Sequence, residues 1–83
     1  MNKRELIKII KEAEANGLIE LDLSGQNIKE LPKEIGNLTK LRSLNLLGNN
    51  KLASLPSELG NLSSLEELNL SGTKLSSSLS SID

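Results

Sequence analysis

The chain has 83 residues, and its ten basic and eleven acidic side chains give a formal net charge of −1 at pH 7. A chain of this length has room for one small domain. It contains no histidine, cysteine or aromatic residue, so the usual general base, nucleophilic thiolate, soft metal ligands and base-stacking rings are all missing. We therefore expect no enzyme, no catalytic or metal site, no cofactor and no nucleic-acid binding.

The start of the chain is not apolar enough for a signal peptide or a membrane span. The apolar run from Leu6 to Ile10 is interrupted by Lys8 and followed by Lys11 and Glu12. A secretory signal needs about seven uninterrupted apolar residues, and a spanning helix needs about twenty. The chain also lacks the disulfides that stabilise many small secreted domains. We expect a cytoplasmic location and no membrane association.

Residues 3 to 16 are predicted to form an amphipathic helix. Four apolar residues recur at helical spacing, namely Leu6, Ile9, Ile10 and Ala13. Three basic residues fall on the opposite side, namely Arg4, Lys8 and Lys11. Asn2 and Glu5 have the spacing of a capping box, and Asn16-Gly17-Leu18 has the pattern of a left-handed helix stop.

The basic side of this helix has two interpretations. It is either the solvated face of a helix that covers the first coil of a repeat array, or a patch for a membrane or an acidic partner. We favour the first, because Glu5, Glu12 and Glu14 dilute the positive charge and repeat arrays need capping elements.

An internal repeat follows the helix. The pattern LxxLxL begins at Leu18, Leu41 and Leu65, at spacings of 23 and 24 residues. The segment LPKEIGNL, residues 31–38, recurs as LPSELGNL, residues 55–62. In each strand the leucines alternate with polar residues, so one face is core and the other is solvent. The proline prevents further strand pairing, and we expect all apolar side chains of a unit to converge on one axis.

These motifs resemble the leucine-rich repeat family from Leu18 to about Leu75, especially the subclass with LPxxIGNL that occurs in many intracellular bacterial, animal and plant proteins. The resemblance implies an α/β solenoid of about three coils, with a short parallel sheet on the concave face and an N-terminal capping helix. We divide the single domain, residues 1–83, into a helical cap (1–17), repeat 1 (18–40), repeat 2 (41–64) and an incomplete repeat 3 (65–83). The helix followed by LIELDLSG is also similar to the entry into bacterial leucine-rich repeat proteins, some linked to Ras-like GTPase domains.

The sequence departs from the family pattern at two places. The ninth position of each unit usually holds asparagine, whose amide satisfies backbone groups in the bend, but here the column is Gln26, Asn49 and Thr73. We expect looser turns in the first and third coils. The second unit has one extra residue in Asn49-Asn50-Lys51, which predicts a local bulge on the rim of the array where these residues lie.

The end of the chain has no LPxxIGNL segment. After Leu70 the sequence is rich in serine, which is too small and polar to cover the apolar side of a third coil. Two explanations remain open. Either the chain is a fragment of a longer repeat array, or it self-associates through this open end.

Because catalysis and nucleic-acid binding are not expected, we predict a protein-interaction module that binds a protein partner through the concave sheet. The candidate residues flank the inward leucines in three rows, with Arg42 beside them: Glu20, Ser43, Glu67; Asp22, Asn45, Asn69; Ser24, Leu47, Ser71. Leu47 is either an ordinary exposed leucine or the anchor of a contact. The alternative function is architectural: the N-terminal part of a larger repeat protein, or a designed repeat scaffold, without a partner of its own.

Overall fold

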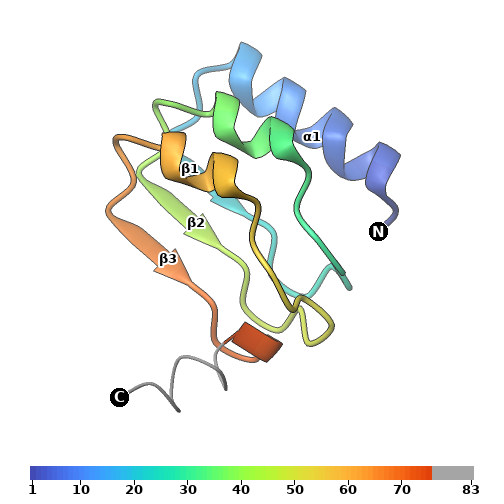
Figure 1. Ribbon diagram of the computed structural model, residues 1–83. Helices are drawn as coiled ribbons and strands as arrows, with labels where there is room; N and C mark the ends of the chain where they lie inside the picture. Colours follow the sequence, from blue (N-terminus) through green and yellow to red (C-terminus); the bar gives the residue numbers. More distant parts are fainter. Residues whose placement is uncertain (76–83) are drawn as a thin grey trace.

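The computed structural model describes residues 1–75, in which an N-terminal α-helix, three short strands and two 3-10 helices form a stack of coils (Figure 1). A further helical turn begins at Lys74. The helix α1 spans Lys3–Ala15. Its Asn2 cap is confirmed, because Asn2 Oδ1 accepts a hydrogen bond from the backbone N–H of Glu5 at 2.8 Å. Asn2 Nδ2 also donates to Glu5 Oε1 at 3.2 Å, so the two side chains hold each other.

The predicted left-handed stop of α1 is also confirmed. Gly17 has φ +60°, a backbone conformation that residues with a Cβ rarely adopt. The N–H of Leu18 donates to the Ala13 carbonyl at 3.0 Å, and the N–H of Gly17 donates to the Glu14 carbonyl at 3.1 Å. This pair of bonds is the Schellman arrangement, which satisfies two carbonyls at the helix end.

Three strands form a parallel sheet in the order β1, β2, β3. Their bounds are β1 Glu20–Asp22, β2 Ser43–Asn45 and β3 Glu67–Asn69. The register aligns the central leucines, Leu21 with Leu44 and Leu44 with Leu68. Each strand is short because the chain must turn toward the outer half of its coil after three residues.

The outer half of each coil contains a short 3-10 helix after its proline. η1 spans Lys33–Asn37 and η2 spans Ser57–Asn61. In Figure 1, α1, η1 and η2 lie side by side on the side opposite the sheet. The helix α1 therefore takes the outer position that a preceding coil would occupy, as the predicted cap requires.

The core lies between the sheet and the outer layer. It contains the predicted helix residues Leu6, Ile10 and Ala13, with Ile9 packed against it, and the inward leucines of the first two strands. Ile35 and Leu38 of the first coil are buried, at 0% and 3% exposure. Gly36 is buried as well, and a Cβ there would lie 2.7 Å from the Glu58 carbonyl oxygen. Only a glycine allows η1 and η2 to approach this closely.

Three residues contradict the prediction that all apolar side chains of a unit point inward, namely Leu18, Ile19 and Leu68. Ile19 is the most exposed of them, at 49%. Leu18 is 40% exposed, because the helix stop at Gly17 turns the chain away from the core. Leu68 is 36% exposed, because β3 is an edge strand within the described residues and its coil lacks a covering helix there. Leu21 of β1, the other edge strand, is 8% exposed, because α1 covers the first coil. The end of the predicted third repeat, residues 76–83, lies outside the described residues.

Asn49 occupies the bend between the first and second coils and is fully buried. Its Oδ1 accepts hydrogen bonds from the N–H groups of Gln26 and Ile28, at 3.1 and 2.9 Å. Its Nδ2 donates to the carbonyls of Leu23 and Leu46, both at 2.9 Å. The asparagine of the second unit therefore also satisfies the bend of the first, where the exposed Gln26 does not enter the core.

Thr73 and the extra residue of the second unit, which also depart from the family pattern, are accommodated locally. Thr73 is buried, and its hydroxyl donates to the Leu70 carbonyl at 2.6 Å. The extra residue of the second unit is accommodated in a turn on the predicted rim, closed by a bond from the Leu52 N–H to the Asn49 carbonyl at 3.0 Å. Asn50 lies in this turn and is exposed.

Candidate interaction surface

The polar face of the sheet brings together the first two predicted rows. Strand pairing places Glu20 opposite Ser43 and Ser43 opposite Glu67. The same register forms the second row, Asp22, Asn45 and Asn69. Ser43 and Asn45 on the central strand are half-buried and the other four are exposed, whereas Leu44 between them is buried. The rows therefore form one continuous polar surface above a leucine layer.

The second row has a structural role that we did not predict. Asp22 Oδ1 accepts a hydrogen bond from the N–H of Ser24 at 2.9 Å. Asn45 and Asn69 do the same for the N–H of Leu47 and of Ser71, each at 3.0 Å. Each side chain forms an Asx turn that ends its strand. The hydrogen bonds from Ser24 also lower the pKa of the Asp22 carboxyl.

The third row begins where the strands end. The N–H of Gly25 donates to the Leu47 carbonyl at 2.8 Å, and the N–H of Gly48 donates to the Ser71 carbonyl at 2.9 Å. These bonds extend the alignment of Ser24, Leu47 and Ser71 beyond the strands. Leu47 is 43% exposed, so a large apolar side chain lies at this end of the sheet.

Arg42 lies at the other end of the sheet and forms an ion pair with Glu66, through its Nε and one carboxylate oxygen. Their hydrogen bond and mutual attraction raise the pKa of Arg42 and lower that of Glu66, and Glu20 and Glu67 raise the pKa of Arg42 slightly further. We predicted Arg42 as a site residue but missed Glu66. The repeat contains the signal, because both occupy the second position of LxxLxL, in adjacent units.

Carboxylates dominate this surface. Arg42 pairs directly with Glu66 and also attracts Glu20 and Glu67 at longer range. One cation therefore faces several carboxylates, and neither Glu20 nor Glu67 forms a direct ion pair with it. A shallow hollow of about 280 Å³ lies at the acidic end and is lined by Ile19, Glu20, Arg42, Ser43, Glu66 and Glu67. Such a surface can form hydrogen bonds and ion pairs with a positively charged group.

The chemistry of the rest of the surface is limited. Across residues 1–75, no group of three or more carboxylates is arranged to hold a metal ion. The same part of the chain has no helix long and apolar enough to cross a membrane. Every fully buried side-chain nitrogen or oxygen among the described residues has a hydrogen-bond partner. No unsatisfied polar group therefore marks a hidden site there.

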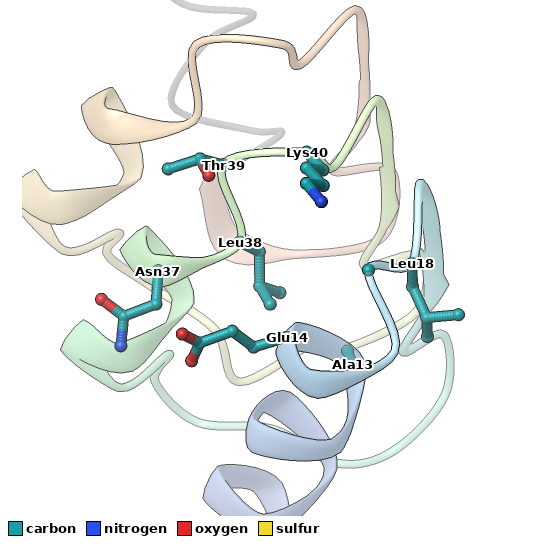
Figure 2. A pocket seen from close by; sticks show the side chains of 8 residues that line it. Ala13, Glu14, Leu18, Asn37, Leu38, Thr39 and Lys40 are labelled. Atoms are coloured by element: carbon teal, nitrogen blue, oxygen red, sulfur yellow. The ribbon is translucent and has the colours of Figure 1, made fainter.

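A second hollow lies where α1 ends beside the end of η1 (Figure 2). Its volume is about 220 Å³. Figure 2 shows Leu38 directed toward α1 and Leu18 directed away from it. The hollow is small, and its polar groups come from Glu14, Asn37, Thr39 and Lys40. None of these belongs to the predicted site, which lies on the sheet.

Comparison with known families agrees with this architecture. The family model described as leucine-rich repeats in two copies matches residues 16–61, and a single leucine-rich repeat model matches residues 64–83. The chain belongs to the leucine-rich repeat family. Repeats of this family generally mediate protein–protein interaction, and they are typically not enzymes. No curated protein matches the chain.

Proposed function

We propose that the chain is an interaction module that binds a protein partner through the polar face of its sheet, in the cytoplasm. The main support is the alignment of two polar rows beside an exposed apolar residue, Leu47. Side chains held on paired strands keep their spacing, so a partner meets a preorganised surface.

The size of the face sets an expectation for affinity. The face consists of three five-residue segments that run from the first row to the third, about 4.8 Å apart and with about 3.3 Å per residue, and these cover roughly 240 Å². A standard protein interface has about 800 Å² per partner. The isolated chain is therefore expected to bind weakly, or to supply part of a longer surface.

One observation favours the architectural alternative. The oxygens of the second row bind the chain's own backbone, and Arg42 binds Glu66, so part of the face already satisfies itself. In this alternative the chain is one end of a larger scaffold without a partner of its own. Site-specific photo-crosslinking inside the producing cell separates the two functions.

The crosslinker is placed at Ser43 on the sheet, with a matched control at Lys33, which is exposed at the start of η1. An interaction module gives a defined crosslinked protein from Ser43 and not from Lys33. With the purified partner, Leu47→Ser should weaken binding roughly tenfold and leave the fold intact, because truncating an apolar anchor costs more than about 1 kcal/mol. No selective crosslink from Ser43, or Leu47→Ser binding like wild type, contradicts the proposal.

A further inference from the structure

The outer side of α1 carries a stripe of positive charge that the proposed function does not use. At about 100° per residue, Arg4, Lys8, Lys11 and Ala15 fall within an arc of roughly 60° on the side away from Leu6. All four are exposed. Glu5, Glu12 and Glu14 lie on the flanks of the helix rather than within this arc.

This stripe also has an apolar component. A shallow hollow of about 460 Å³ on the helix surface is lined by Arg4, Ile7, Lys8, Lys11, Glu12 and Ala15. Ile7 is half-buried, so part of its side chain remains open to a partner. The outer face of α1 therefore combines three cations with a small apolar area.

The acidic sheet face is complementary to this stripe in charge and in spacing. Glu20 and Glu67 lie in one row with Ser43 between them, so their strands are about 9.6 Å apart. Arg4 and Lys11 are seven helical residues apart, which corresponds to about 10.5 Å along the axis. The pair of cations therefore matches the pair of carboxylates.

We propose that the chain binds a second copy of itself, with the basic face of α1 in one copy lying on the acidic sheet face of the next. The net charge of −1 opposes this contact little, because two copies repel each other weakly as whole molecules. Each copy offers one face of each kind, so the contact is heterologous and open-ended.

The contact uses the same sheet face as the proposed function. It does not depend on whether a different protein also binds there. It is small, and most of its charges are exposed, so we expect weak association that depends on salt. The identity of the protein crosslinked from Ser43 separates the two proposals. A different protein supports the proposed function, whereas a second copy of this chain supports self-association, so the two failures are distinguishable.

Sedimentation equilibrium of the purified chain between 0.05 and 1 mM tests the proposal. At about 20 mM salt, where the Debye length is about 20 Å, the average mass should rise with concentration, and the dissociation constant should increase at least fivefold at about 300 mM salt. Two charge-reversed variants then test the faces: Arg4→Glu with Lys11→Glu on the helix, and Glu20→Lys with Glu67→Lys on the sheet. Each variant alone should be monomeric, because its two faces carry the same sign.

Mixing the two variants in equal amounts should restore association, because each reversed face then meets a face of opposite sign. This rescue excludes damage to the fold as the cause of the monomeric state, and circular dichroism of each variant checks the same point. A wild-type chain that stays monomeric at 1 mM and low salt overturns the proposal. A mixture of the two variants that stays monomeric also overturns it. Association that persists in the helix variant, or that does not depend on salt, overturns it as well and would indicate contact through the open end of the array.

Discussion

The second and third repeats carry the same LxxLxL pattern but experience different surroundings. Leu44 and Leu46 of the second repeat are 1% and 0% exposed, whereas Leu68 is 36% exposed and Leu70 is half-buried. The second repeat has a paired strand on each side, and β3 is paired on one side within the described residues. Neighbouring coils, rather than the motif itself, therefore determine how much a leucine contributes to stability.

The first repeat is intermediate between these two. Within the described residues it follows α1, which covers its outer half, and Ile10 of this helix is fully buried. The helix does not pair with β1, so it protects the core without extending the sheet. Four predictions test this comparison of the coils.

The largest expected effect comes from breaking the cap. Ile10→Asp removes a fully buried side chain and places a carboxylate between α1 and the first coil, at a cost of about 4 kcal/mol or more in the free energy of unfolding. Lys8→Asp, on the exposed side, should cost less than about 1 kcal/mol. Urea denaturation followed by circular dichroism measures both. Equal losses would show that the helix is not packed on the repeats.

The next prediction compares the two repeats directly. Leu46→Ser should cost about 4 kcal/mol, while Leu70→Ser, at the equivalent and half-buried position of the third unit, should cost about 1–2 kcal/mol. If Leu46→Ser is unfolded in buffer, titration with a stabilising osmolyte recovers its free energy of unfolding. Similar losses at both positions would contradict the idea that coverage by neighbours sets the contribution.

A smaller effect is expected in the bend that joins the first two coils. Asn49→Ala removes four hydrogen bonds to backbone groups, three of them buried, which should cost about 3 kcal/mol. Asn50→Ala is the matched control, since Asn50 is the next residue and is exposed, and it should change stability by less than about 0.5 kcal/mol. Hydrogen exchange should locate the loss at the Gln26 and Ile28 amides. Unchanged protection there would contradict the bridging role of Asn49.

The smallest effect is electrostatic. The pKa values of Asp22 and Glu66 are lowered in the folded chain, so their contribution to stability is present above the unfolded pKa and is lost as pH falls through the folded pKa. NMR titration should therefore give both carboxyls a lower pKa than in the urea-unfolded chain. Arg42→Ala should return the pKa of Glu66 to its ordinary value and leave that of Asp22 low, because Ser24 provides the latter's hydrogen bonds. If the pKa of both groups rises in this variant, the two causes have been assigned wrongly.

The features predicted correctly from sequence depend on residues close together in the chain or on the period of the repeat. Asn2 and Glu5 cap α1, Gly17 ends it, and the alignment of the LxxLxL units gives the strand register. Each needs only a local hydrogen bond or a comparison of equivalent positions. The parallel sheet and the covering helix follow from these signals.

The features missed depend on contacts between coils. The sequence predicts that Asn49 satisfies backbone groups in the bend of its own unit, but two of its hydrogen bonds go to N–H groups of the preceding bend. The exposure of Leu18 depends on the direction in which the chain leaves α1, which the repeat pattern does not contain. The Asx turns of Asp22, Asn45 and Asn69 were missed for another reason. A polar residue that faces solvent can bind either a partner or the backbone N–H two residues later, and the alternation of the strand does not separate these two roles.

The close contact at Gly36 has a geometric consequence for the array. Backbone hydrogen bonds fix the strands about 4.8 Å apart on the inner side, so the separation of η1 and η2 determines how far the array bends. Because Gly36 lets the outer halves of the coils approach, it limits the difference in length between the two sides. A larger residue there would act as a wedge, and a stack of such coils would curl more tightly around its sheet. The radius of the inner surface, and therefore the range of shapes that fit against it, is set by a glycine on the opposite side of the molecule.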